Sequence, residues 1–216
     1  MASRFKGKPR AYEYGKNRDI RVLEGIEKFR YMNTPQIAEL YFQTIKNPEQ
    51  RLKKASERMK RMYDRDYVQR FRFPSEPFIF TVKGNKYNQH IQHYLMIVNI
   101  WITLQKLKPS GSVLTCEVET KQENVITDLL VEYRNNFRGE NKIYWIEVEN
   151  ESSANIIDKV KKYEALAWAR RAYNLPAGVL CVAYKKNATI KAQEAYTGDL
   201  TFKAVSYKRF EQDWTW

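Results

Sequence analysis

The stretch from Asn47 to Tyr63, NPEQRLKKASERMKRMY, indicates how the first part of the chain folds. Asn47 can cap a helix, and Pro48 fits its first turn, where no N–H donor is needed. One face is predicted to be buried, with the spacing of a helix: Leu52, Ala55, Ser56, Met59, Met62 and Tyr63. The other face carries six cations: Arg51, Lys53, Lys54, Arg58, Lys60 and Arg61. Such a helix suits the major groove of DNA, although most charge runs are only solvated faces.

The distribution of charge favours the groove interpretation. The chain has 216 residues and a net charge of +13, and residues 1–89 hold 21 Lys+Arg against 10 Asp+Glu. The remaining residues are nearly balanced. Because the basicity belongs to the first part, we expect a polyanionic partner for that part.

The elements around the Asn47 helix complete a recognisable order. Two short helices are predicted before it, at Arg18–Phe29 and Thr34–Phe42, and two strands after it, at Tyr67–Phe73 and Phe78–Val82. Three short helices followed by a hairpin form a winged helix-turn-helix, whose third helix enters the major groove. The hairpin and its flank supply candidate phosphate contacts: Arg70, Arg72, Lys83 and Lys86. The alternative is a winged helix that contacts proteins.

The second part is predicted to be an α/β unit. An almost wholly apolar connecting helix at residues 90–108 comes first. Strands, a helix and further strands follow: Val113–Glu119, Val125–Tyr133, Lys142–Glu149, a helix at 153–173 that buries Trp168, a buried strand at 177–184, and Leu200–Val205 as an edge strand or cover. The predicted fold class is therefore α+β, with a basic leader at residues 1–17, a winged helix at 18–89 and an α/β domain at 109–216.

Composition excludes several classes of protein. The most hydrophobic run, Tyr94–Leu104, is too short to span a bilayer, so no membrane association is expected. Cys116 and Cys181 both lie in apolar runs and are expected to be buried thiols. We expect a cytoplasmic protein, and one that needs no cofactor to bind DNA.

Carboxylates gather at the predicted strand ends. Glu117 and Glu119 end the first strand, Asp128 begins the second, and Glu147 and Glu149 lie on one face of the third. Converging carboxylates can hold a Mg²⁺ ion, which lowers the pKa of an attacking water in phosphodiester hydrolysis. The candidate metal ligands are Glu117, Asp128 and Glu147. Alternatively, these are strand-end polar residues of an inactive scaffold.

The acids resemble the PD-(D/E)xK nuclease core, with two departures. Thr127 stands where that pattern has proline, and Glu149 stands where it has lysine. Lys159, on the following helix, is a candidate substitute for that lysine. The candidate catalytic residues are therefore Asp128, Glu147, Glu149 and Lys159.

Several segments together resemble the replication-relaxation family of Gram-positive plasmids, phages and mobile elements. The matching pieces are RDIRVLEGIEKFRYMNTPQIAELYF, RLKKASERM, HYLMIVNIWITL, ITDLLVEY, IYWIEVEN and KVKKY. The resemblance implies a winged helix joined to a nuclease-like α/β domain, in a protein of plasmid replication or DNA transfer. It puts Asp128, Glu147 and Glu149 on the acid positions, with Lys159 and Tyr163 on the next helix, although the family's Glu-x-Asp is Glu-x-Glu here.

These observations favour a double-stranded-DNA-binding accessory or regulatory protein of a mobile element. The expected partners are DNA, a second copy of the chain, and replication or relaxase proteins. One alternative is a Mg²⁺-dependent endonuclease or nickase, and another is an assembly scaffold whose winged helix binds protein.

Overall fold

The chain has a mixed α+β fold that divides into two compact units, Met1–Leu95 and Met96–Trp216. The computed structural model describes residues 13–74, 76–85, 90–149, 156–173, 178–184, 190, 193–194 and 196–216. The expected fold class is confirmed at this level. Most of the expected leader, residues 1–12, lies outside the described residues, and its end is already helical from Glu13.

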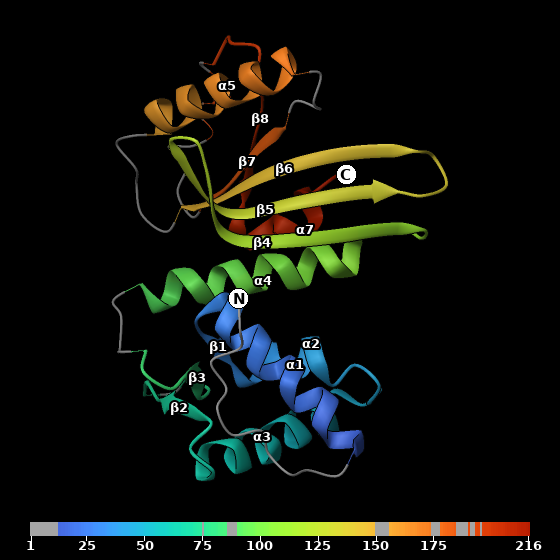
Figure 1. Cartoon of the computed structure of the whole chain (residues 1–216), viewed down its shortest axis with the longest axis vertical. Coiled ribbons are helices and arrows are strands. Elements are labelled where there is room, and N and C mark those ends of the chain that lie inside the picture. Colours follow the sequence, from blue (N-terminus) through green and yellow to red (C-terminus); the bar gives the residue numbers. More distant parts are fainter. Residues whose placement is uncertain are drawn as a thin grey trace. The chain divides into compact units, whose positions relative to one another are not determined.

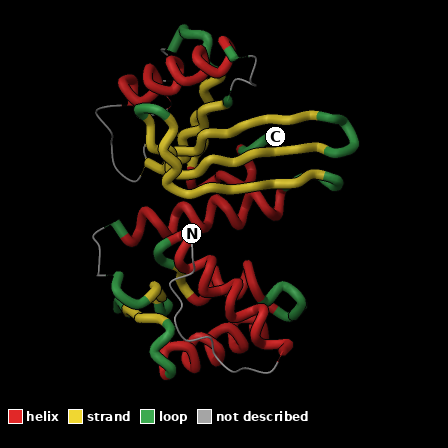
Figure 2. Tube along the Cα trace, in the orientation of Figure 1, coloured by secondary structure: helices red, strands yellow, loops and turns green. Residues whose placement is uncertain are grey.

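Unit 1 combines three helices with a small antiparallel sheet (Figures 1 and 2). Its elements are α1 (Glu13–Phe29), β1 (Met32–Asn33), α2 (Thr34–Tyr41), α3 (Pro48–Asp64), β2 (Val68–Phe71) and β3 (Ile79–Val82). The sheet order is β1-β3-β2, so the hairpin expected after the third helix is present. The short strand β1, which the sequence patterns did not indicate, pairs with β3 on its other side.

The starts of α2 and α3 follow from capping chemistry. The side chain of Asn47 accepts a hydrogen bond from the Gln50 N–H at 3.0 Å, as the sequence predicted. In α2 the cap is Asn33, which forms a reciprocal capping box with Gln36. The sequence pattern suggests Thr34 as this cap, but Thr34 is already the first helical residue.

The core of unit 1 lies between α1, α2, α3 and the sheet. The inner side chains of α1 predicted from the sequence are all buried: Val22, Leu23, Ile26 and Phe29. A close approach of α1 and α2 depends on Gly25, because a Cβ there would lie 1.7 Å from the hydroxyl of Tyr41. Deep between α1 and α3, the Arg58 guanidinium donates two hydrogen bonds to the buried carboxylate of Asp19. This ion pair sets the rotation of α3 about its axis.

The long apolar helix α4 (Ile91–Leu107) contains the boundary between the two units. Its first turn belongs to unit 1, where the Gln36 side chain donates a 2.7 Å hydrogen bond to the carbonyl of Leu95. The expectation that this helix is buried is confirmed for most of its apolar side chains: Ile91, Tyr94, Leu95, Met96, Ile97, Val98, Ile100, Ile102 and Leu104.

Unit 2 is built on a five-stranded mixed sheet of order β4-β5-β6-β7-β8. Its elements are β4 (Ser112–Gln122), β5 (Val125–Asn135), β6 (Glu140–Glu149), α5 (Ile156–Ala172), β7 (Val179–Tyr184), β8 (Thr201–Ser206), a 3-10 turn at Tyr207–Arg209 and α7 (Phe210–Asp213). The first three strands form an antiparallel meander, and β7 is parallel to both β6 and β8. The buried strand expected at 177–184 is β7, which lies inside the sheet, and the edge strand suggested for Leu200–Val205 is β8.

The two faces of this sheet have different covers (Figure 1). On one face, Val160, Tyr163, Leu166 and Ala167 of α5 pack against a core that includes Trp145 and Leu180. On the other, Trp214 packs 5.2 Å from Tyr144 and Trp216 stacks 5.0 Å from Tyr133, measured between ring centroids. The aromatic residues at the end of the chain therefore pack on the sheet of their own unit. Trp168, expected inside, is 71% exposed because it points away from the buried stripe of α5.

The ion pair between Arg58 and Asp19 provides a test of this packing. Arg58→Met should lower the free energy of unfolding by about 3 kcal/mol, because it leaves the Asp19 carboxylate buried without a cation. Lys60→Met is the matched control: Lys60 is exposed on the same helix, and its loss should change stability by less than about 0.5 kcal/mol. Urea unfolding of both variants measures the difference, and equal stabilities would contradict the structural role of Arg58.

Candidate functional site

A cluster of charged side chains lies where β5, β6 and α5 meet. The ammonium of Lys159 lies 2.7 Å from Oε2 of Glu147 and 2.8 Å from Oε1 of Glu149. Asp128 is close enough to raise the pKa of Glu147 through its negative charge. The structure thus brings together the four residues predicted as catalytic: Asp128, Glu147, Glu149 and Lys159.

Strand alternation explains why two of these acids share a face. Glu147 and Glu149 flank Val148 on β6, so their side chains point to the side of α5 while Val148 points to the opposite side. From α5, Lys159 reaches both carboxylates. The exposed fraction of the side chain is 1% for Glu147, 14% for Glu149 and 35% for Lys159. The cluster therefore begins in the core and opens towards solvent at the lysine.

The alternation of side chains along β5 breaks next to the cluster. Val125 and Leu130 face the same core although an odd number of positions separates them, so the alternation of β5 breaks between them. Opposite the break, Glu119 of β4 has φ +49°, in the left-handed region that costs a non-glycine residue energy. The β5–β6 pairing begins at Leu129–Ile146, and just beyond it the Asp128 carboxylate accepts a 2.8 Å hydrogen bond from the Val148 N–H. The carboxylate of Asp128 thus accepts the Val148 N–H, where a backbone carbonyl of a neighbouring strand would ordinarily be the acceptor.

Glu147 belongs to a chain of hydrogen bonds with two buried hydroxyl groups. The Tyr163 hydroxyl donates to Oε1 of Glu147, and its oxygen lies 2.8 Å from the hydroxyl of Thr127. Either hydroxyl can donate in the contact between Tyr163 and Thr127. The Thr127 and Tyr163 side chains are both fully buried. No sequence pattern indicated that Thr127, which stands at the proline position of the nuclease pattern, would have this role.

The electrostatics of the cluster favour one retained proton. Burial, followed by the charge of Asp128, raises the pKa of Glu147 to about 7 against the opposing effects of Lys159 and Tyr163. Burial lowers the pKa of Lys159, but its contacts with Glu147 and Glu149 outweigh this and raise it. Burial, and then Glu147, raises the pKa of Tyr163. Its two carboxylate contacts therefore keep the lysine charged, while burial, followed by the charge of Asp128, makes Glu147 hold a proton until near neutrality.

The predicted metal ligands do not fit a divalent cation as they lie. Both oxygens of Glu147 already have partners, one in Tyr163 and one in Lys159. Glu117 is exposed in the middle of β4, where its carboxylate accepts a hydrogen bond from Thr120 at 3.3 Å. Within the described parts of the chain, no three His, Cys, Asp or Glu side chains are grouped so as to hold a metal. The donor set suits an ammonium in this arrangement.

The second candidate site is the outer face of α3 in unit 1. Ala55, Met59 and Met62 are buried as predicted, but Leu52 is 41% exposed and Tyr63 is 39% exposed. Ser56 is exposed as well, and all three residues were expected inside. They fall outside because Arg51 and Arg58 lie on the inward-facing side of α3. The aliphatic parts of these two arginines and their ion pairs with Glu39 and Asp19 take up the space there. The exposed residues from Leu52 to Asp64 are Leu52, Lys53, Lys54, Ser56, Lys60, Arg61, Tyr63 and Asp64.

Three of the six cations predicted on α3 are engaged within unit 1. Arg51 donates to Glu39 at 2.8 Å and to the carbonyl of Ile45 at 3.0 Å. Arg58 is held by Asp19. Both arginines therefore hold α3 in place, which corrects their assignment to a groove-facing surface. Lys54 forms an exposed pair with Glu57, one helical turn away, at 3.0 Å. Such a pair contributes little and leaves the lysine available.

The hairpin extends the basic face of α3. The guanidinium of Arg70 lies 4.0 Å from the ring centroid of Tyr63 and 4.7 Å from that of Phe78. Arg72 lies 5.2 Å from the same Phe78 ring. Lys83 pairs with Asp66, and both side chains are largely exposed. Lys86, the remaining hairpin candidate, lies outside the described residues.

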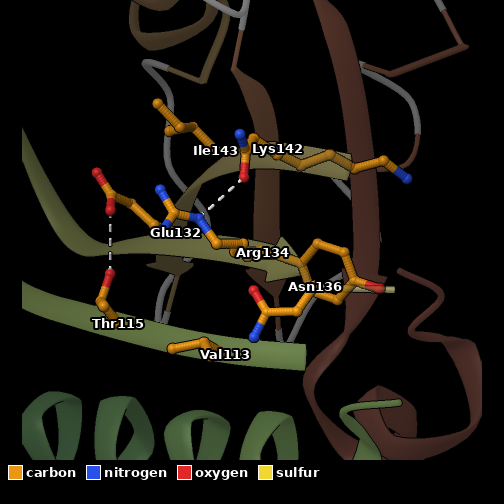
Figure 3. A pocket seen from close by; sticks show the side chains of 9 residues that line it. Val113, Thr115, Glu132, Arg134, Asn136, Lys142 and Ile143 are labelled. Carbon is orange, nitrogen blue, oxygen red and sulfur yellow. Dashed lines mark hydrogen bonds between the residues drawn. The ribbon is translucent and has the colours of Figure 1, made fainter. Parts of the chain in front are cut away.

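A cavity of about 420 Å³ lies at the far end of the meander from the acid cluster. Figure 3 shows its lining: Val113, Thr115, Glu132, Tyr133, Arg134, Asn136, Asn141, Lys142 and Ile143. Glu132 accepts from Thr115 at 3.3 Å, and Arg134 donates to Asn141 at 3.2 Å (Figure 3). The charged groups are of both signs and bonded to neutral neighbours, and no residue predicted from the sequence lies here.

The raised pKa of Glu147 predicts how stability depends on pH. Below the ordinary glutamate value of 4.5, folded and unfolded chains both carry this proton. As the pH rises to about 7, the unfolded chain loses it while the folded chain keeps it, so the free energy of unfolding falls. The loss should reach about 3 kcal/mol, from about 1.4 kcal/mol per pKa unit. Asp128, Glu149, Lys159 and Tyr163 are the ionisable groups that face Glu147.

Urea unfolding between pH 4.5 and 8 provides the measurement. Glu147→Gln keeps the shape but cannot ionise, so the difference in stability between wild type and variant should shrink or reverse as the pH rises. Parallel pH profiles for the two proteins would contradict the buried, proton-holding state of this residue.

Comparisons of the chain with protein-family models, curated proteins and solved structures gave no match. Among the helices that the structure describes, none has the length and apolar character needed to cross a bilayer.

Proposed function

We propose that unit 1 is a winged-helix module that binds double-stranded DNA with α3 in the major groove. The order α1-β1-α2-α3-β2-β3, with β1 closing the three-stranded sheet, is that of a winged helix. In such a module the third helix enters the groove and the β2–β3 hairpin follows the phosphate backbone. The net charge of the first part of the chain supports the same partner.

The observation that carries this proposal is the composition of the exposed face of α3. Lys53, Lys60 and Arg61 are exposed there, and the fixed arginines of the same helix turn inwards. Leu52 and Tyr63 are large apolar side chains left open between the cations. In a major groove, such side chains can contact thymine methyl groups while the cations reach guanine edges or phosphates.

The hairpin arginines suit phosphate contacts. Stacking on Tyr63 and Phe78 restricts Arg70 and Arg72 while leaving both side chains exposed. A guanidinium restricted in this way loses less conformational freedom when it binds a phosphate. We therefore propose that Arg70 and Arg72 bind phosphates, which strengthens binding and positions the protein along the duplex. The outer face of α3 would contact the bases.

For unit 2 we propose a nuclease-like scaffold of the PD-(D/E)xK type. An antiparallel meander, then a helix, then a strand parallel to the third, is the order of that core, and it supports the resemblance of the sequence to the replication-relaxation family. The whole chain would then be a DNA-binding accessory or regulatory protein of a plasmid or phage, with relaxase or replication proteins, or a second copy of the chain, as further partners.

The groove proposal predicts the effect of removing exposed charge. The triple variant Lys53→Ala, Lys60→Ala, Arg61→Ala should bind a DNA duplex at least about tenfold more weakly at moderate salt. Its plot of log affinity against log salt should be shallower, by about 1 for each phosphate that the variant no longer neutralises. Fluorescence anisotropy across a salt series measures both quantities.

Two controls make this test specific. Lys208→Ala removes an exposed cation of unit 2 and should leave affinity nearly unchanged. Leu52→Ala removes no charge, so it should weaken binding to a preferred sequence more than to random DNA. Unchanged binding by a correctly folded triple variant would refute the assignment of α3.

A second candidate function is phosphodiester hydrolysis by unit 2. It is favoured by the convergence of Asp128, Glu147, Glu149 and Lys159, the residue types that a PD-(D/E)xK nuclease uses. Glu149 stands at the lysine position of that pattern, and Lys159 of α5 brings a cation to the same place. The fit of these groups to a divalent metal is poor in the present arrangement, so we derive no metal-dependent step.

Incubation of supercoiled plasmid with the protein and Mg²⁺ or Mn²⁺ tests this candidate. Nicking by wild type that is lost in Asp128→Asn would support it. Equal nicking by both proteins would remove this cluster from consideration, and so would nicking by neither.

A further inference from the structure

We propose that Lys159 is the resident cation of the acid cluster, and that its ammonium keeps divalent ions out of a site that Asp128, Glu147 and Glu149 would otherwise form. This inference concerns unit 2 alone and does not rest on DNA binding by unit 1.

The ammonium lies where a metal would have to bind. It is 2.7 Å from one oxygen of Glu147 and 2.8 Å from one oxygen of Glu149. A Mg²⁺ ion bridging the same carboxylates would lie about 2.1 Å from their oxygens. The two cations would therefore share one space, and only one of them can be present.

The lysine has two advantages over a dissolved ion. It is tethered, because its neighbours Val160 and Tyr163 on α5 are buried against the sheet, so its concentration at the cluster is always high. It also needs no free carboxylate oxygen on the inner side, where Tyr163 already donates to Glu147. A divalent ion would have to displace the ammonium and find ligands beyond those that Lys159 uses.

Without the ammonium, the remaining groups have the chemistry of a site for a hard cation. The facing oxygens of Glu147 and Glu149 would border a space that is open to solvent at the Lys159 side, and Asp128 lies close enough to Glu147 to act on its charge. Oxygen donors of this kind suit Mg²⁺ or Mn²⁺. One Asp128 oxygen accepts from the Val148 N–H, which holds this carboxylate beside Glu147. Removing the lysine is therefore expected to create a metal site, whereas removing a metal ligand normally destroys one.

Mn²⁺ binding to four purified full-length proteins tests the proposal. The proteins are wild type, Lys159→Met, Lys159→Arg and the double variant Lys159→Met, Glu147→Gln. Titrations are made at pH 8, because metal ligands must be deprotonated, and are followed by calorimetry and by the paramagnetic resonance of free Mn²⁺. Neither readout depends on enzymatic activity.

Lys159→Met is expected to bind one Mn²⁺ at least about tenfold more tightly than wild type, since one ligand group commonly changes metal affinity by about 10–100-fold. Lys159→Arg keeps a cation and should behave like wild type. The double variant should lose the gain. A Mn²⁺-dependent rise in the melting temperature of Lys159→Met, absent in the double variant, is the matching thermal result.

Two results would overturn the proposal. One is wild-type binding of Mn²⁺ as tight as that of Lys159→Met and weakened by Glu147→Gln, because the lysine would then not exclude the ion. The other is a folded Lys159→Met protein that binds no Mn²⁺. If Lys159→Met does not fold, the melting temperatures of wild type and Asp128→Asn are measured with and without Mn²⁺. A rise in wild type that is absent in Asp128→Asn refutes exclusion of the ion. No rise in either protein supports exclusion.

The outcome separates this inference from the candidate nuclease activity. Metal exclusion without plasmid nicking supports the resident-cation proposal and argues against hydrolysis. Tight wild-type Mn²⁺ binding at these acids refutes the resident cation and leaves hydrolysis open.

Discussion

Glu147 is a carboxylate with 1% of its side chain exposed, and unit 2 is arranged around the need to compensate it. A buried carboxylate without partners would be strongly destabilising. Here α5 supplies two of them, the ammonium of Lys159 and the hydroxyl of Tyr163. They lie one helical turn apart, so they can both reach Glu147 only in one rotation and one register of α5 on the sheet. A buried ion pair adds little net stability, and its main contribution here is this choice of a single packing.

Unit 1 uses the same device. Asp19 is buried on α1, and Arg58 must face it from α3. Arg51 adds a second link, to Glu39 of α2. Together they rotate α3 so that Leu52 and Tyr63 point outwards with the exposed lysines. The surface proposed for DNA is thus a consequence of ion pairs on the other side of the same helix.

Much of the architecture could be predicted because its signals are local. Capping by Asn47, the apolar stripe of α1 and the runs of β-branched and aromatic residues depend on neighbours within a few positions. Alternation along β6 correctly put Glu147 and Glu149 on one face. Along β5 the alternation does not hold throughout, because Val125 and Leu130 face one core at an odd separation, opposite the positive φ of Glu119. No local pattern announces such a break, because it depends on how two strands fit each other.

The sequence by itself determined most of the element order, the charge segregation and the identities of the acids and of Lys159 as candidates, since periodicity, capping and charge are properties of the chain. Only the tertiary structure decided which charges are engaged internally. Arg51 and Arg58 look identical in the sequence to the exposed cations of the Asn47 stretch, yet they face Glu39 and Asp19. Lys159 is ten residues from Glu149, yet its ammonium lies between Glu149 and Glu147. The physical reason is that ion pairing depends on distance and burial in space, and both are set by how helices pack on a sheet.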